Sequence, residues 1–258
     1  MARRRSPATN QFAPKAAQRP APVRRQRRPA QAELPFRQHG GARPGAGRKP
    51  KGLLPLVAHT PRPALSARTP VHVTVKLRPG LPKLRQPRER AVLLAVFAAA
   101  KQRAGRTGKR FRLTHFAILN DHLHLLAEAE DRQALARAVQ GLLIRIARAL
   151  NRLWRRRGRL FADRYHDRAL TSPRAVHAAL CYVLANGKKH AAEGRAVTVP
   201  QAVDVFTSAP WFDGFVESFT VRGLGALEPP VVAPRSWLLA IGWRRRGLLS
   251  VFDLPATA

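Results

Sequence analysis

The chain has 258 residues, of which 48 are Lys or Arg and only 14 are Asp or Glu, and its formal net charge is +34. A charge of this size predicts a polyanionic partner, with nucleic acid as the first candidate. The single cysteine, Cys181, excludes an intramolecular disulfide and a zinc site built from several thiolates. No apolar run is long enough to cross a bilayer and none follows the basic start, so we expect a cytoplasmic protein without a membrane anchor or secretion signal.

The first 64 residues differ in composition from the rest of the chain. They hold 11 of the 22 prolines, and residues 1–51 carry 14 Lys or Arg against a single acid, Glu33. A segment of this kind cannot bury enough apolar surface to offset the chain entropy that folding removes. We therefore predict a disordered basic leader over residues 1–64.

Part of this leader, Gly40–Pro50, ends in Gly-Arg-Lys-Pro. An extended arginine-containing segment of this type is reminiscent of arms that lie in the minor groove of DNA. The alternative, which we favour, is a solvated basic tail that adds nonspecific affinity for phosphates. We assign Arg43, Arg48 and Lys49 to DNA contacts of this kind.

The ordered part begins near Pro70 with an alternation of valines and polar residues that predicts a half-buried strand over residues 71–77. A helix is expected over residues 88–103, after Pro87. Two strands follow, one over residues 111–119 and one starting at His122. The Asn120-Asp121 pair offers a tight turn between them, which predicts an antiparallel hairpin.

A long helix, an irregular strand and a further helix are expected next. Asp131 can cap a long helix over residues 132–156, and Gly158 should stop it. An irregular strand is expected over residues 160–170. Ser172-Pro173 then provides a cap and a first-turn proline for a helix that ends near residue 185 or 186.

This order of elements predicts an α+β fold. Strand-helix-strand-strand-helix-strand is the ferredoxin-like split βαβ arrangement, an antiparallel sheet with helices packed on one face. We place this domain at residues 65–195. The region over residues 196–258, with Trp211-Phe212 and Arg244-Arg245-Arg246, is expected to be a basic, partly ordered extension rather than a second domain.

The most informative stretch is the hairpin turn and the strand after it, Asn120-Asp121-His122-Leu123-His124-Leu125-Leu126. Because side chains of a strand alternate, His122 and His124 should share one face while the leucines opposite enter a core. Two imidazoles about 7 Å apart on a rigid strand can chelate one divalent metal. The alternative is a pair of exposed histidines on a half-buried strand.

The long helix predicted over residues 132–156 has an apolar stripe on one face and an almost acid-free basic face on the other. A charge run is often only a solvated surface, but one with so few acids favours a surface that faces phosphates. Our assignments to DNA binding on this face and further along the chain are Arg145, Arg148, Arg152, Arg155, Arg156, Arg164, Lys188 and Lys189.

The chain has only two tyrosines, Tyr165 and Tyr182. Tyr182 and Asn186 are four residues apart on the last helix and therefore share a face. A phenol beside a metal-bound phosphate can act as a nucleophile, and the amide oxygen of Asn186 could be a third ligand beside the histidines. Taken singly, these residues also fit a core tyrosine and a helix-terminal asparagine. We interpret Tyr165 and His166 as structural or DNA-contacting residues.

Together, His122-Leu123-His124, the Gly158–His166 stretch and the Tyr182–His190 stretch form a recognisable pattern. The sequence resembles the single-tyrosine HUH transposases of bacterial insertion sequences, and particularly the REP-associated tyrosine transposases. The resemblance covers about residues 66–192. It departs at Asn120-Asp121-His122, where the family has Pro-Asn-His, and at Asn186-Gly187, where the family has Asn-Pro.

The resemblance implies an HUH endonuclease core in which His122, His124 and Asn186 bind Mg²⁺ or Mn²⁺. It also implies that Tyr182 is the nucleophile, which becomes linked to a 5′ phosphate and frees a 3′ hydroxyl. The leading hypothesis is thus a metal-dependent transposase or endonuclease that cuts and joins single-stranded DNA at hairpin-forming repeats. We expect it at the bacterial nucleoid, as a monomer or a homodimer.

Two other hypotheses remain. One is a catalytically inactive protein that binds nucleic acid with the same fold. The other is a plasmid replication initiator or relaxase, which shares the chemistry but carries helicase or primase domains that do not fit in 258 residues.

Overall fold

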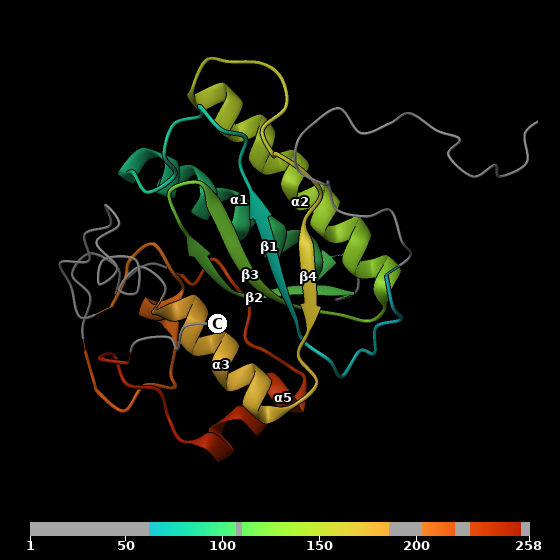
Figure 1. The fold of residues 1–258 in the computed structure, drawn as a ribbon, viewed down its shortest axis with the longest axis vertical. Helices are drawn as coiled ribbons and strands as arrows, with labels where there is room; N and C mark the ends of the chain where they lie inside the picture. Colours follow the sequence, from blue (N-terminus) through green and yellow to red (C-terminus); the bar gives the residue numbers. More distant parts are fainter. Residues whose placement is uncertain (1–61, 107–109, 186–202, 220–227, 254–258) are drawn as a thin grey trace, which may run out of the picture. The chain divides into compact units, whose positions relative to one another are not determined.

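The structure is a computed structural model that describes residues 62–106, 110–185, 203–219 and 228–253 (Figure 1). Most of the predicted leader, with Arg43, Arg48 and Lys49, lies outside these residues. So do Asn186, Lys188 and Lys189.

The described elements follow the predicted order. They are β1 (Val71–Lys76), α1 (Pro87–Arg106), β2 (Phe111–Ile118), β3 (His122–Ala129), α2 (Arg132–Leu153), β4 (His166–Ala169) and α3 (Pro173–Leu184), followed by η1 (Ala209–Trp211), α5 (Trp237–Ala240) and η2 (Gly242–Arg246). The four strands form one sheet in the order β2-β3-β1-β4, with antiparallel neighbours throughout. The α+β class and the antiparallel sheet are therefore confirmed.

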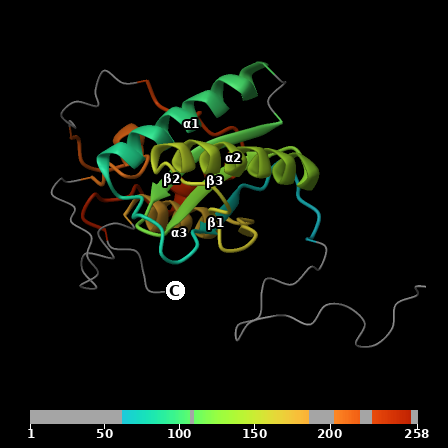
Figure 2. The same ribbon diagram turned by 90° about the horizontal axis from the view of Figure 1, so that it is seen from above.

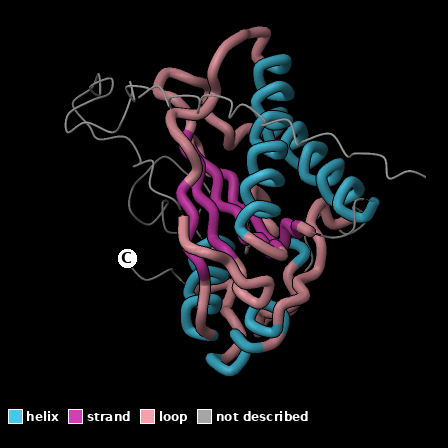
Figure 3. The backbone as a smooth tube through the Cα atoms, turned by 90° about the vertical axis from the view of Figure 1, so that its right-hand side faces the viewer, coloured by secondary structure: helices cyan, strands magenta, loops and turns pink. Residues whose placement is uncertain are grey.

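Helices cover both faces of the sheet. Figure 2 shows α1 and α2 on one side of the strands and α3 on the other, and the tube in Figure 3 shows helices on either side of the strands. The prediction of helices on one face holds for α1 and α2 but not for α3. The physical reason lies in β3, where seven of eight residues are buried, since a strand buried on both faces needs cover on both.

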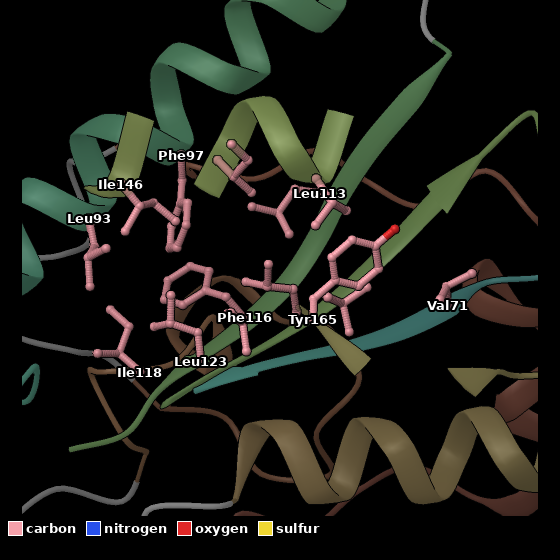
Figure 4. Close-up of a cluster of buried hydrophobic side chains, with 14 of the residues drawn as sticks. Val71, Leu93, Phe97, Leu113, Phe116, Ile118, Leu123, Ile146 and Tyr165 are labelled. Carbon is pink, nitrogen blue, oxygen red and sulfur yellow. The ribbon is translucent and has the colours of Figure 1, made fainter. Parts of the chain in front are cut away.

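Each face has its own hydrophobic core. Figure 4 shows the core beneath α1 and α2, where Leu93 and Phe97 of α1 meet Phe116 and Leu123 of the sheet. The core beneath α3 joins residues of α3 to Leu126 of β3 and to the C-terminal part of the chain. Its C-terminal members are Val203, Ala209, Leu239, Trp243, Leu249 and Val251.

The ends of α2 follow from its caps. Asp131 accepts a hydrogen bond from the Ala134 amide at 2.7 Å, as the sequence predicts for an N-cap. The helix ends at Leu153 rather than at 156, because Arg155 adopts a left-handed conformation with φ of 49°. The Arg156 amide then donates to the carbonyl of Asn151 at 2.9 Å, which closes the helix.

The strand predicted over residues 160–170 is shorter than expected. Only His166–Ala169 pairs regularly with β1, and Phe161 makes an isolated bridge to Leu77. The Arg78 amide also donates to the Leu160 carbonyl. Residues 160–165 therefore run irregularly along the edge of β1. The next helix begins as predicted, with Ser172 accepting from the Ala175 amide.

The C-terminal part is tied to the sheet by polar contacts as well as by its core. Arg85 binds the carboxylate of Asp204 through two hydrogen bonds of 2.8 and 2.9 Å, in a pair that is almost fully buried. The carboxylate of Glu128, on β3, accepts from the amide and the hydroxyl of Ser236. The first pair fixes the segment that carries η1, and the second set of contacts fixes the segment that carries α5 and η2.

Candidate active site

A row of polar side chains lies on the face of the sheet that α3 covers. The valines of β1 at positions 71, 73 and 75 point into the opposite core, so His72 and Thr74 lie on this face. The antiparallel register pairs Thr74 with His124 and Lys76 with His122. Alternation within two neighbouring strands thus gathers three histidines and one threonine.

The two histidines of β3 lie against each other. Their ring centroids are 4.8 Å apart and the rings are perpendicular. His124 is buried, whereas His122 is half-buried at the start of the strand. The structure therefore brings together the two imidazoles that we expect to hold a metal.

Asp121, in the hairpin turn, orients His122. Its Oδ1 lies 2.7 Å from Nδ1 of His122. Burial alone would raise the pKa of this carboxyl, but the hydrogen bond and charge of His122, together with Lys76, hold that pKa below its usual value. The carboxylate is ionised and only accepts, so Nδ1 of His122 donates. In a neutral ring the lone pair then belongs to Nε2.

His124 is oriented by β1. Its Nδ1 lies 3.0 Å from Oγ1 of Thr74 and 3.1 Å from Nε2 of His72. With Nδ1 engaged in this way, Nε2 is the atom through which His124 would bind a metal. A carboxylate on the second ring nitrogen, as Asp121 provides for His122, is characteristic of metal-binding histidines, and Thr74 and His72 fix the orientation of the His124 ring.

Tyr182, on α3, packs onto this group. Its ring centroid lies 5.1 Å from that of His124 and 6.0 Å from that of His72. Buried neighbours on α3, Val183 among them, anchor the helix in the core and hold the tyrosine half-buried over the histidines. The nucleophile candidate thus contacts His124, one of the metal-ligand candidates, although 58 residues separate Tyr182 from His124.

His72 is the residue of this site that the sequence did not single out. Burial, followed by the charge of Arg168, lowers the pKa of His72 to about 4, so its ring is neutral near pH 7. It contacts both His124 and Tyr182. The alternation of β1 already places His72 on the face opposite the valines. Only the pairing of β1 with β3 shows that His72 contacts His124.

Tyr165 occupies the other face of the sheet. It belongs to the core beneath α1 and α2, where Figure 4 shows it near Leu113. The guanidinium of Arg62 lies 4.0 Å from its ring centroid. Burial raises the pKa of the Tyr165 phenol, with Arg62 opposing. This buried environment fits the structural role that we expected for Tyr165. His166, its neighbour, is exposed on β4.

The arginines assigned to DNA binding are not close to this site. Arg148 and Arg152 are exposed on α2. Arg145 is half-buried near Arg103 of α1, and burial, together with the charge of Arg103, lowers the pKa of Arg145. Arg155 and Arg156 follow the end of α2, and Arg164 lies beside it. All six lie with α2, across the sheet from Tyr182.

The donors that the structure describes fit a divalent metal only in part. His122 and His124 offer two imidazoles whose second nitrogens are oriented, while the predicted third ligand, Asn186, follows the last described residue of this segment. Within the described residues there is no group of three or more His, Cys, Asp or Glu side chains that could hold a metal ion.

Comparisons with known proteins add little. No family model matches the chain and no curated protein matches it. Among solved structures, it is similar to a REP-associated tyrosine transposase bound to a REP hairpin. That likeness has a TM-score of 0.40 and 14% identity, and covers 52% of this chain and 74% of that chain. A likeness this weak carries no argument.

None of the described helices is both long enough and apolar enough to cross a bilayer.

Proposed function

We propose that this protein is a metal-dependent enzyme that cleaves and rejoins single-stranded DNA at hairpin-forming repeats, with Tyr182 as the nucleophile. The observation that carries the proposal is the packing of the Tyr182 ring on His124 and His72, next to His122. The net charge of +34 supports a nucleic acid as the substrate.

The proposed reaction is an exchange of phosphodiester bonds. The phenolic oxygen of Tyr182 attacks the scissile phosphorus, forming an O–P bond while the bond from phosphorus to the 3′ oxygen breaks. The phenolic proton passes through solvent to the released 3′ oxygen. The downstream strand stays on Tyr182 through its 5′ phosphate, and attack by another 3′ hydroxyl rejoins DNA and regenerates the phenol.

His122 and His124 would hold the metal, with Asn186 as the proposed third ligand. Bound there, Mg²⁺ or Mn²⁺ would supply Lewis-acid stabilisation of the charge that develops on the phosphate. Asp121 and Thr74 orient the two imidazoles through their Nδ1 atoms. The leucines of β3 on the opposite face fix the strand, so the two rings keep their spacing.

An adduct assay tests the proposal. The full chain is incubated with Mn²⁺ or Mg²⁺ and 3′-labelled hairpin oligonucleotides drawn from the repeats that flank its own gene, and a denaturing gel is inspected for a covalent band. We expect a band that disappears with chelator, with Tyr182→Phe and with His122→Ala. Tyr165→Phe is the matched control and should keep the band, because its phenol lies in the opposite core.

Two outcomes would change the proposal. Tight, salt-sensitive binding of these oligonucleotides without any adduct would favour an inactive DNA-binding protein on the same fold. An adduct that survives Tyr182→Phe would mean that another residue is the nucleophile.

A further inference from the structure

A second surface of the chain has the composition of a binding site for unpaired bases. It is a hollow of about 660 Å³ lined by Arg68, Arg235 and Trp237, with Ala67, Ser236 and Leu238. Trp237 is 46% exposed, although tryptophan is highly buried on average, and it is the one exposed residue among the four tryptophans.

The Trp237 ring is held in place rather than left mobile. A Cβ on Gly242 would lie only 2.7 Å from the indole, so the ring packs directly on the backbone of η2. The guanidinium carbon of Arg245 lies 4.9 Å from the ring centroid. The residue before Trp237 is fixed too, because the buried carboxylate of Glu128 accepts hydrogen bonds from Ser236.

The charge around the ring is positive and unbalanced. Arg68, Arg235 and Arg245 are all exposed, and no ion pair of the described residues involves any of them. The nearest buried acid, Glu128, already binds the Ser236 hydroxyl and the side chain of Arg112. The guanidinium groups of Arg68 and Arg235 are therefore available to an anion from outside the protein, while that of Arg245 lies over the Trp237 ring.

This surface lies on the same side of the sheet as the candidate active site. Glu128 comes four residues after His124 on β3 and shares its face, so the Ser236 anchor lies about 13 Å along the strand from His124. One polynucleotide strand is long enough to reach both surfaces on this side of the sheet, where the buried Leu126 and α3 lie between them. The arginines of α2, by contrast, lie on the far face.

We propose that the surface formed by Arg68, Arg235, Trp237 and Arg245 binds an unpaired nucleotide of the DNA strand, whose base stacks on Trp237. Stacking on a fixed aromatic ring, beside cations that hold the backbone, is how proteins bind single strands without reading their sequence. A base pair inside a duplex offers no free face to such a ring. The inference rests on the proposed function in one respect, because the identity of the polymer as single-stranded DNA is taken from it. It does not require that the protein cleaves this DNA.

The test measures binding without catalysis. The full chain is titrated with a decamer of thymidylate in chelator, and both fluorescence anisotropy of the labelled oligonucleotide and tryptophan emission are followed. We expect quenching of tryptophan emission on binding, and we expect Trp237→Ala to abolish most of it and weaken binding about tenfold or more. Trp237→Phe keeps a ring and should restore part of the affinity.

Controls separate stacking from charge and from misfolding. Arg157→Ala, an exposed arginine beyond the end of α2, removes the same charge as Arg68→Ala but should change binding less. An abasic decamer carries the phosphates without bases, so Trp237→Ala should barely affect it. Unchanged circular dichroism would show that the variants fold.

Three outcomes would overturn the inference. One is equal loss of abasic and thymidylate binding in Trp237→Ala. The second is no loss of either. The third is an effect of Trp237→Ala on anionic lipid vesicles but not on DNA, which would indicate a membrane-facing surface. A failure of the proposed function can be told apart from a failure of this inference. Tyr182→Phe should lose the covalent adduct but keep the quenching that depends on Trp237.

Discussion

The Tyr182 ring stands nearly perpendicular to the His124 ring, with centroids 5.1 Å apart and an interplanar angle of 80°. The first residue belongs to a helix and the second to a strand, and the core between α3 and the sheet fixes both elements. A phenol in this position can approach a phosphate that the two β3 histidines help to hold.

Asp121 should control metal affinity. Asp121→Asn replaces the carboxylate that orients His122, and loss of such a partner typically weakens metal binding about 10- to 100-fold. Calorimetric titration with Mn²⁺ measures the change. Asp131→Asn is a matched control, because it removes the same charge at the start of α2 and asparagine still caps a helix. Equal affinity in both variants would contradict the assignment.

His72 should position His124 rather than react itself. His72→Phe removes the Nε2 atom that contacts Nδ1 of His124, and we expect adduct formation to slow about 10- to 100-fold. His72→Gln can place a polar atom near the same point and should recover most of the rate. The comparison uses single-turnover rates at saturating metal. If both variants lose activity equally while remaining folded, hydrogen bonding by His72 is not what matters.

The stability of the fold should fall in mild acid because of His115. This residue is buried beneath residues 203–219, with Nδ1 at 3.3 Å from the Ser208 hydroxyl and its ring centroid 5.5 Å from that of Phe212. Burial lowers its pKa from 6.5 to about 4, against an opposing effect of Asp213. The unfolded chain therefore takes up a proton that the folded chain does not, so stability is complete above pH 6.5 and is lost as pH falls towards 4.

The expected loss from this one group is about 3 kcal/mol between pH 7 and pH 4. Urea unfolding at several pH values measures it. His115→Asn keeps a polar atom near Ser208 but cannot titrate, so its unfolding free energy should vary less with pH than that of the parent. Identical pH dependence of the two proteins would exclude His115 as the cause.

The buried pair of Arg85 and Asp204 should be critical for attachment of the C-terminal segment. Asp204→Ala leaves the guanidinium of Arg85 buried without its carboxylate, which typically costs about 3–5 kcal/mol of folding free energy. Glu130→Ala breaks the exposed pair with Arg110 and should cost at most about 1 kcal/mol. Urea unfolding of both variants gives the comparison, and similar losses would contradict the difference in burial.

Local patterns predicted that His122 and His124 lie together because this relationship lies within one strand. Alternation along a strand is enough to put His122 and His124 on one face, and the capping residues Asp131 and Ser172 mark where two helices begin. The hairpin between β2 and β3 follows from its two-residue turn, in which the Leu119 amide donates to the His122 carbonyl.

Contacts between elements that are distant in the chain could not be predicted from the sequence. The contact of His72 with His124 requires the pairing of β1 with β3, and the separation of the α2 arginines from Tyr182 requires knowledge of which face each helix covers. The end of α2 was misjudged because Arg155 takes a left-handed conformation that glycine usually supplies. The burial of Trp243 and Leu249 against α3 comes from a segment without regular periodicity.

The most direct test of the central claim is to find which residue carries the DNA. The covalent adduct is digested with nuclease and trypsin, and the peptides are sequenced by mass spectrometry. We predict a nucleotide attached through phosphate to Tyr182, with Tyr165 unmodified. A nucleotide on Tyr165, or on a residue other than tyrosine, would contradict the proposed mechanism.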